Sequence, residues 1–355
     1  MSLVDIQIQD VRNINRIHFQ PSAGLNIIVG PNGSGKTSLL ESLYILSRAR
    51  SFRTQNINKV LSHGKSKLIV FSKLDDGETI KKIAIQKNKV ETVIRINGKT
   101  EKKASELSKH LHTHLIRPES QALLEGGSTG RRSFIDLGVF HVKHSFLEAL
   151  KNYNLCLKNR NKLLKQKEFK TLPVWGNKLA EYGIIITTER SAYVERFELE
   201  LNPIVKILIG DVEVDVKYTN GWLDKVTLPE ALERSLEKDK RYGYTTTGAH
   251  KADLKIFIDG NAAQDYLSRG RMKLLVIAMY LAQIKLMGQI ELKSVCVLLD
   301  DLAAELDVKS FRKVMLFLVS LGIQVFVTTT NEKAFLGFIG KGDAKLFHVK
   351  HGAIF

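Results

Sequence analysis

The sequence predicts an α/β fold in which a helical domain is inserted into a mixed sheet whose front portion is antiparallel. Three stretches of the 355 residues carry this prediction. An apolar run at 25–29 precedes a glycine-rich turn and then a segment with apolar residues at helical spacing. Residues 68–96 alternate between apolar and polar side chains around hairpin turns, whereas residues 131–209 are apolar at helical spacing.

Residues 1–120 are expected to consist mainly of strands. Asp75-Asp76-Gly77 and Asn97-Gly98 are typical of hairpin turns, and they leave no room for the crossover helices that parallel strands need. The stretch between 68 and 96 is therefore predicted to be an antiparallel meander. The expected elements are strands at 3–8, 14–19, 25–29, 68–71, 79–85, 93–96 and 114–119, a helix that continues to about Ala49, and a short helix at 101–111.

The turn after residues 25–29 has the composition of a phosphate-binding loop. Its glycines allow successive backbone N–H groups to point at one anion, and the following helix adds its positive end. Lys36 can reach the β- and γ-phosphates of ATP, and the Thr37 hydroxyl can ligate Mg²⁺. The alternative is a glycine-rich turn with a solvated lysine. The predicted ATP-binding residues are Gly30, Pro31, Asn32, Gly33, Ser34, Gly35, Lys36, Thr37 and Ser38.

Two carboxylates follow an apolar strand predicted at 294–299. Asp300 can hold Mg²⁺, directly or through water, and Asp301 can polarise the attacking water. Lys36 and Asp301 are therefore the two predicted catalytic residues. The alternative is a pair of loop carboxylates that cap the next helix.

A second candidate anion site lies where a long helix begins at Leu267-Ser268-Arg269-Gly270 and runs to about Met287. A helix N-terminus with a hydroxyl and a bare backbone can bind an anion. An ordinary N-cap serine has the same composition. Four residues alone do not separate the two interpretations.

Residues 131–209 are predicted to contain at least two long helices, with a break near Leu172-Pro173 and an interruption at Pro203. The formal net charge of +17 favours a polyanionic partner, with DNA or RNA ahead of a membrane surface, although a solvated basic surface is the alternative. Arg50 and Arg53 can contact the phosphates of a nucleotide or of DNA, or they can cap a helix C-terminus, where positive charge is favourable. The DNA-binding candidates are Arg50, Arg53, Lys151, Lys158, Arg160, Lys162 and Lys165, with Arg131 and Arg132 as further candidates.

The remaining part of the chain returns to an α/β pattern. The expected elements are strands at 212–217, 254–258 and 324–328, helices at 229–240 and 308–321, a polar loop at 245–253, and a last hairpin around Gly352. No run of 18 apolar residues occurs, and the first residues alternate like a strand, so neither a membrane span nor a signal peptide is expected. Cys156 and Cys296 have no metal-like spacing, which fits a reduced, cytoplasmic compartment.

Taken in order, these motifs resemble the ABC-type ATPase heads of the SMC kind. The motifs are the phosphate loop and the segments 267–270, 298–307 and 325–330. Over nearly the whole chain the closer resemblance is to the bacterial RecF family. The segments that carry it are Val11-Arg12-Asn13, Arg50-Ser51-Phe52-Arg53, Arg131-Arg132-Ser133-Phe134-Ile135-Asp136, Lys158-Asn159-Arg160-Asn161 and His250-Lys251-Ala252-Asp253-Leu254.

The resemblance implies an ATPase head formed by residues 1–120 and 211–355, with residues 121–210 as an inserted basic helical arm. It also implies an ATP-dependent head-to-head dimer in which Ser268 and Gly270 meet the ATP of the partner and Asp307 lies at the dimer seam. The family acts in recombinational DNA repair and replication, binds single-stranded, duplex and junction DNA at gaps, and has a weak, DNA-stimulated ATPase. RecR- and RecO-type mediators, recombinase loading and SOS induction are implied as well.

The chain departs from the family pattern at several positions. Arg271-Met272 stand where a glutamine commonly follows the glycine, and Ala304 stands where serine is usual. Thr328-Thr329-Thr330 contain no switch histidine, and Gln121 is the candidate for the Gln-loop residue. An ATPase subunit of another SMC-like repair or nuclease complex, a translocating motor and a transporter ATPase are the competing functions. A motor would need tandem cores or helicase elements, and the basic insertion disfavours a transporter.

Overall fold

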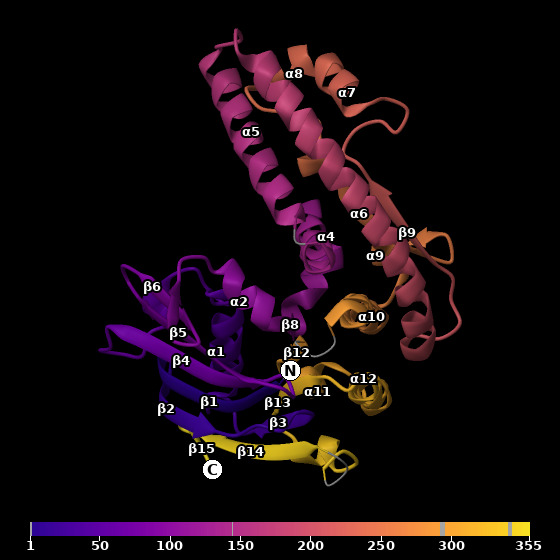
Figure 1. Cartoon of the computed structure of the whole chain (residues 1–355). Helices are drawn as coiled ribbons and strands as arrows, with labels where there is room; N and C mark the ends of the chain where they lie inside the picture. The colour runs from indigo at the N-terminus through magenta and orange to yellow at the C-terminus, as the bar shows by residue number, and fades with distance from the viewer. Residues whose placement is uncertain (1, 144, 292–294, 340–342) are drawn as a thin grey trace. The chain divides into compact units, whose positions relative to one another are not determined.

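The computed structural model describes residues 2–143, 145–291, 295–339 and 343–355 of an α/β protein. The chain divides into two compact units (Figure 1). The phosphate-loop unit comprises Met1–Ser120 and Gly288–Phe355, and the helical unit comprises Gln121–Met287. The helical unit thus begins where the sequence placed the inserted arm, but it continues well past residue 210.

The meander of the phosphate-loop unit forms an antiparallel sheet. In the described part of the chain the strand order is β2 (Ile14–Phe19), β1 (Ser2–Val11), β4 (Lys67–Asp75), β5 (Ile80–Asn88), β6 (Thr92–Ile96) and β7 (Lys99–Glu101). Buried and less buried residues alternate along β4, as expected for a sheet with one face on a core. Asn97 and Gly98 have positive φ at the β6–β7 turn, where a two-residue hairpin requires it.

A second sheet positions the phosphate loop. Its described strands are β15 (Ala353–Ile354), β14 (Ala344–Lys350), β3 (Leu25–Val29), β13 (Gln324–Thr329), β12 (Val295–Leu299) and β8 (His112–Ile116), in that order. These strands pair in parallel, except for the antiparallel β14–β15 hairpin. All residues of β3, β12 and β13 are buried, which is typical of parallel strands covered on both faces.

The meander and the phosphate loop therefore lie in separate sheets, which corrects the expectation of one mixed sheet. Both sheets contribute side chains to one apolar core around α1 (Lys36–Arg48). Ile6 comes from the antiparallel sheet, Leu39 from α1, and Phe326 from the parallel sheet. Buried side chains on the faces of the two sheets meet in this core, and no backbone ladder joins their described strands.

Local boundaries in the phosphate-loop unit also differ from the prediction. The expected helix at 101–111 begins later, because β7 ends at Glu101 and α2 spans Ser105–His110. A short 3₁₀ turn, Pro118–Gln121, follows β8 in place of a longer strand. Ser294, expected in a strand, lies outside the described residues. The remaining elements are α11 (Leu302–Glu305), α12 (Val308–Ser320) and the 3₁₀ turns at Ile57–Lys59 and Glu332–Phe335.

Long helices dominate the helical unit. Helices α4 (Ser128–Val142), α5 (Phe146–Gln166) and α6 (Leu172–Leu208) are followed by a three-stranded sheet with the order β11 (Asn261–Ala262), β10 (Asp253–Ile258) and β9 (Val214–Thr219). Figure 1 shows α5 and α6 side by side. The other elements are α3 (Ala122–Glu125), α7 (Leu228–Arg234), α8 (Leu236–Tyr242), the 3₁₀ turn Ala249–Lys251, α9 (Ala263–Tyr266) and α10 (Arg269–Glu291).

The predicted break near Leu172-Pro173 is found immediately before α6, whereas the predicted interruption at Pro203 is wrong. The break between the long helices falls at residues 167–171, and Pro173 lies in the first turn of α6, where the missing N–H has no intrahelical acceptor in any case. Pro203 lies inside the helix, which continues to Leu208. Leu201, Ile204 and Val205 are buried around it, so tertiary packing offsets the lost hydrogen bond.

Candidate functional site

The glycine-rich loop connects the end of β3 to the start of α1. Gly33 and Gly35 have φ of 77° and 116°, which side chains strongly disfavour. A Cβ at Gly30 would lie 2.3 Å from the carbonyl oxygen of Val349 and 2.7 Å from Ser34 Oγ. The loop backbone therefore passes too close to its neighbours for another residue type at this position.

Lys36, the first residue of α1, is buried and points back along the loop. Its Nζ donates hydrogen bonds to the carbonyl oxygens of Gly30 (2.8 Å) and Pro31 (3.1 Å). Burial lowers the pKa of Lys36, and the carboxylates of Asp301 and Asp300 act in the opposite direction. The ammonium group is thus held over the loop by two neutral acceptors, which an anion can replace.

Thr37 and Asp300 meet at the ends of two different elements. The Thr37 hydroxyl donates to Asp300 Oδ1 over 3.0 Å, and the Thr328 hydroxyl donates to the same oxygen over 2.8 Å. Burial raises the pKa of Asp300 above its ordinary value, although both hydroxyls lower it. A hydroxyl and a carboxylate at this spacing form a hard oxygen donor pair of the kind that Mg²⁺ prefers.

Asp301 has a strained backbone at the end of β12. Its φ of 53° is in the left-handed region, and its N–H donates to Thr328 Oγ1 over 2.9 Å. The buried Oδ1 of Asp301 has no hydrogen-bond partner among the described residues. Strain together with an unpaired buried oxygen is typical of a functional position.

A second unpaired polar atom supports the fit of a phosphate group to this loop. Ser34 Oγ is buried and has no hydrogen-bond partner in the described part of the chain. The Ser34 carbonyl accepts a hydrogen bond of 2.8 Å from the N–H of Gly352, in the turn between β14 and β15. The loop therefore combines a fixed backbone with a free hydroxyl, and both suit an anion that makes many hydrogen bonds.

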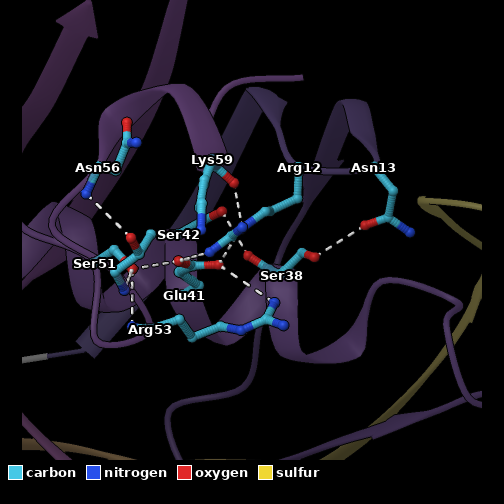
Figure 2. Close-up of polar contacts among 10 residues, drawn as sticks. Arg12, Asn13, Ser38, Glu41, Ser42, Ser51, Arg53, Asn56 and Lys59 are labelled. Atoms are coloured by element: carbon cyan, nitrogen blue, oxygen red, sulfur yellow. Dashed lines mark hydrogen bonds and ion pairs between the residues drawn. The ribbon is translucent and has the colours of Figure 1, made fainter. Parts of the chain in front are cut away.

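Sequence reasoning missed Asn13 as a support of the loop. Asn13 Nδ2 donates to the carbonyl oxygen of Gly33 over 3.1 Å, and Asn13 Oδ1 accepts from Ser38 Oγ over 2.9 Å. Figure 2 shows Asn13 and Ser38 facing one another. One amide thus joins the loop to the first turn of α1. Its only signal in the sequence was its place in the segment Val11-Arg12-Asn13.

The buried carboxylate of Glu41 on α1 anchors Arg12, the residue that precedes Asn13. Arg12 Nε and Nη2 donate to the two oxygens of Glu41, each over 2.9 Å, and Arg12 also donates to the carbonyl of Lys59. Ser51 donates to the same carboxylate, and Arg53 Nη1 lies 3.8 Å from it (Figure 2). Glu41 has no exposed surface, so this bidentate pair fixes α1 against the β1–β2 turn.

The residues predicted to meet a partner's nucleotide are exposed. In the helical unit, Ser268 and Gly270 lie at the start of α10, and Arg271 N–H lies 3.5 Å from Ser268 Oγ. Arg271 is also exposed, whereas Met272 is buried. In the phosphate-loop unit, Asp307 caps α12 by accepting from Ser310 N–H over 3.0 Å. Hydrogen bonding to the side chain and then to the backbone of Ser310 lowers the pKa of Asp307. Asp307 and Ala304 are likewise exposed.

Burial separates the predicted DNA-binding residues into two groups. Exposed side chains are found at Arg50 and Arg53 in the phosphate-loop unit and at Lys151, Lys158, Lys162 and Lys165 on α5. Arg160 is 2% exposed, and its Nη1 donates to Asp239 Oδ2 over 2.8 Å and to Thr245 Oγ1 over 2.7 Å. This correction removes Arg160 from the candidate surface, because its charge is matched inside the helical unit.

Arg131 and Arg132 also make contacts within the helical unit. Arg131 binds both oxygens of Asp253, over 2.7 and 3.0 Å, and Arg132 donates to the carbonyl of Ala252 over 2.9 Å. Gln121 is half-buried at the start of this unit. None of the helices that the structure describes combines the length and apolar character that crossing a bilayer would require.

Comparison with known proteins gives a family match over almost the whole chain. Residues 2–351 match the family model described as the RecF/RecN/SMC N terminal domain. A protein named DNA replication and repair protein RecF from Shewanella woodyi is 39% identical, and the match covers 100% of this chain and 98% of that protein. A protein of the same name from Shewanella sediminis is also 39% identical, with 100% and 99% covered.

Solved structures agree with the sequence relatives. A structure described as the recombination mediator protein RecF-ATPrS in the RecFOR pathway has a TM-score of 0.87 and 27% identity, covering 99% of this chain and 97% of its own. An Smc head bound to the C-winged helix domain of ScpA has a TM-score of 0.63 at 13% identity, covering 100% of this chain and 96% of its own, which shows the fold alone. The predicted ABC/SMC-type head with an antiparallel sheet and a helical insertion is confirmed.

Proposed function

Because the chain belongs to the RecF family of RecF/RecN/SMC ATPases, we propose that it is an ATP-dependent DNA-binding protein of recombinational repair and replication. ATP binding closes a head-to-head dimer on DNA at single-strand gaps, and slow, DNA-stimulated hydrolysis opens it again. In this role the protein assists recombinase loading and SOS induction in the cytoplasm. The names of the relatives and of the matched RecF-ATP structure support this assignment.

The phosphate loop is the proposed nucleotide site. Lys36 gives up its two carbonyl acceptors to bind the β- and γ-phosphates, while Ser34 Oγ and the loop N–H groups satisfy further oxygens. Thr37 and Asp300 would hold Mg²⁺, which neutralises charge on the phosphates when it is bound. Asp301, whose Oδ1 is unpaired among the described residues, orients the attacking water and accepts its proton.

A partner molecule is proposed to complete the site. Ser268 and Gly270 are exposed at the start of α10, so a second chain can approach them without displacing any side chain packed over them. Asp307 is exposed at the start of α12 and is the proposed contact at the seam. The γ-phosphate held by one chain would then meet the serine of the other, so that nucleotide and dimer form together.

DNA is proposed to bind through its phosphates. The lysines of α5 and Arg50 present exposed cations, and Arg53 stays exposed although its Nη1 lies 3.8 Å from Glu41. Long exposed side chains of this kind suit phosphate contacts more than base recognition. Single-stranded DNA, duplex DNA and their junctions carry the same phosphate charge. RecR- and RecO-type mediators are the proposed protein partners, in keeping with the pathway named for the matched structure.

The observation that carries the proposal is the loop in which Lys36, Thr37 and Asp300 converge with two unpaired buried oxygens. Lys36→Ala is expected to weaken ATP binding about 10- to 150-fold, because a charged hydrogen-bond donor is lost, and to abolish ATP-dependent dimerisation. Sedimentation velocity at micromolar protein with ATP or ADP, with and without gapped DNA, measures the dimer. The matched control is the exposed Lys99→Ala on β7. Wild-type protein that stays monomeric with ATP in both conditions would refute the dimer mechanism.

A further inference from the structure

Two exposed tyrosines flank the turn that ends α8. The rings of Tyr242 and Tyr244 stack with their centroids 5.9 Å apart and their planes 18° from parallel. Each side chain remains about half exposed, at 49% and 47%. Exposed stacked aromatic rings contribute little to a core, and they present apolar π-faces to solvent. We call these two rings the tyrosine platform.

Cations lie beside both rings of the tyrosine platform. Arg241 Cζ is 5.1 Å from the centroid of the Tyr242 ring, and Lys251 Nζ is 5.6 Å from that of Tyr244. A Cβ built on Gly243, between the two tyrosines, would lie 3.8 Å from the Cα of Lys165 on α5. The turn between the two tyrosines therefore packs against the C-terminal end of α5, which carries Lys165, one of the lysines that the proposed function assigns to DNA phosphates.

A third ring with a cation, Phe169, lies in the segment between α5 and α6 and contacts Lys240 of α8. Lys240 Nζ is 5.3 Å from the centroid of the Phe169 ring, which is 38% exposed. Lys240 also pairs with Glu237 over 2.6 Å, so its charge is matched locally. Arg241 and Lys251 make their described ring contacts from long, exposed side chains, so they can move to a phosphate when a base takes their place.

Hydrogen bonds to residues of α5 and α8 hold the tyrosine platform in place. Gly243 has a φ of 74°, and its N–H donates to the Asp239 carbonyl over 2.8 Å. Thr245 donates its N–H and its hydroxyl to Asn161 Oδ1, each over 2.7 Å. Thr246 donates the same two groups to Asp239 Oδ1, over 2.8 and 2.6 Å. The buried Arg160–Asp239 pair thus fixes the turn that presents the rings.

The segment that carries Lys251 is anchored to the same turn. His250 Nε2 lies 3.0 Å from the Thr245 carbonyl, and its Nδ1 lies 2.8 Å from the Tyr153 hydroxyl. Burial lowers the pKa of His250 to about 4, so the ring is neutral at neutral pH. A neutral ring donates from Nε2 to the carbonyl and accepts the tyrosine proton at Nδ1, which leaves no conflict in this chain of bonds.

From this arrangement we propose that the tyrosine platform stacks unpaired bases of single-stranded DNA. Bases of every sequence have π-faces, and a rigid aromatic pair bordered by Arg241, Lys251 and Lys165 offers both stacking and phosphate contacts. Duplex DNA keeps its bases stacked internally and cannot use the rings. The inference deepens the proposed function, since it gives the DNA-binding surface a means of telling the unpaired side of a gap from the duplex side.

The experiment compares single-stranded and duplex binding in the absence of nucleotide. The full-length double variant Tyr242→Leu/Tyr244→Leu is expected to bind oligothymidine about 5- to 150-fold more weakly, the range expected for one stacked base. Its binding to a duplex of the same length should change less than about two-fold. The salt dependence for oligothymidine should stay the same, because the phosphate contacts remain. Fluorescence anisotropy measures all three quantities.

Two further variants separate stacking from other losses. Tyr242→Phe/Tyr244→Phe keeps the rings and should bind like wild type, and Tyr266→Leu removes a tyrosine of equal exposure, 49%, from α9 without effect. Photo-crosslinking with oligothymidine that contains 5-iododeoxyuridine should label residue 242 or 244. Unchanged oligothymidine binding by the leucine variant would overturn the inference, even if that variant loses a protein partner. Failure of ATP-dependent dimerisation refutes the proposed function instead and leaves this result unaffected.

Discussion

Lys36 and Arg160 are both buried cations, yet their surroundings differ in a way that separates binding from support. Lys36, 7% exposed in the phosphate-loop unit, donates to two neutral carbonyl oxygens. Arg160, 2% exposed in the helical unit, donates to the buried carboxylate of Asp239 and to a threonine hydroxyl. A cation held by neutral groups keeps its charge for a ligand, whereas one paired with a carboxylate is already neutralised.

The same comparison applies to the rest of each unit. The loop around Lys36 has fixed backbone, unpaired buried oxygens and a carboxylate pair, so its functional groups are preorganised within one chain. The candidate residues of the helical unit, such as Ser268 and Lys158, are exposed, and their proposed roles require contact with a second chain or with DNA. Burial therefore predicts which substitutions change nucleotide chemistry, which change stability and which change association.

The largest expected effect is on hydrolysis. Asp301→Asn should slow ATP hydrolysis about 10²- to 10⁴-fold, because the amide cannot accept a proton from water, while ATP binding is retained and the dimer persists. Single-turnover hydrolysis and dimer lifetime measure the two outcomes, with the exposed Asp224→Asn as the control. Hydrolysis at the wild-type rate would remove Asp301 from the chemistry of the loop.

The next effect is on the stability of the helical unit. Arg160→Met should lower the free energy of unfolding by about 3–5 kcal/mol, since Asp239 is left as an unpaired buried charge. Urea denaturation measures this loss, and the exposed neighbour Lys158→Met should change stability by less than about 0.5 kcal/mol. If Arg160→Met is as stable as wild type yet loses DNA affinity, the structural role given to Arg160 is wrong, and Arg160 is a DNA-binding residue.

Association is expected to respond next. Ser268→Glu should weaken ATP-dependent dimerisation about 100-fold or more, because a carboxylate is placed against the partner's γ-phosphate in the proposed seam. ATP affinity of the same protein should be unchanged, since the phosphate loop is complete within its own chain. Sedimentation and equilibrium nucleotide binding test both, with Gln264→Glu on α9 as the control. Parallel loss of nucleotide affinity would mean that Ser268 serves its own chain's nucleotide.

The smallest effect concerns the lysine face of α5. Lys158→Ala with Lys162→Ala should reduce the slope of log affinity for duplex DNA against log salt by about 1.8, or 0.9 for each lost phosphate contact. Base sequence should have little influence on the change. Titrations at several salt concentrations test this, and Lys225→Ala with Lys255→Ala is the exposed control pair. An unchanged slope would remove these two lysines from the DNA-binding surface.

Local patterns predicted the elements well, and long-range contacts set the limit. The strand at 14–19 was predicted with the bounds of β2, and the glycine-rich turn fell between a buried strand and a helix as expected. The division into two sheets was missed, because strand periodicity does not say which strands pair. Likewise, a proline marks a helix break by itself, but the packing that lets α6 continue past Pro203 lies elsewhere in the chain.

The candidate site shows the same limit. The types of Lys36, Thr37 and Asp300 predicted a phosphate and metal site, and the structure brings Thr37 and Asp300 to 3.0 Å although 263 residues separate them. The roles of Asn13 and Glu41 were invisible, since each depends on a partner 20 or more residues away. Arg160 was misassigned for this reason: a run of basic residues gives no sign that a carboxylate 79 residues away will bury one of them.

The hydrogen bond from Gly352 to Ser34 has a consequence for the folding of the protein. The nucleotide loop is supported on one side by Asn13 and on the other by the turn between β14 and β15. Before β14 and β15 pair with each other and dock beside β3, the glycine-rich motif lacks this second support, although the segment that supplies it comes more than 300 residues later in the sequence. The capacity to bind nucleotide should therefore arise only late in folding, after the β14–β15 hairpin has formed.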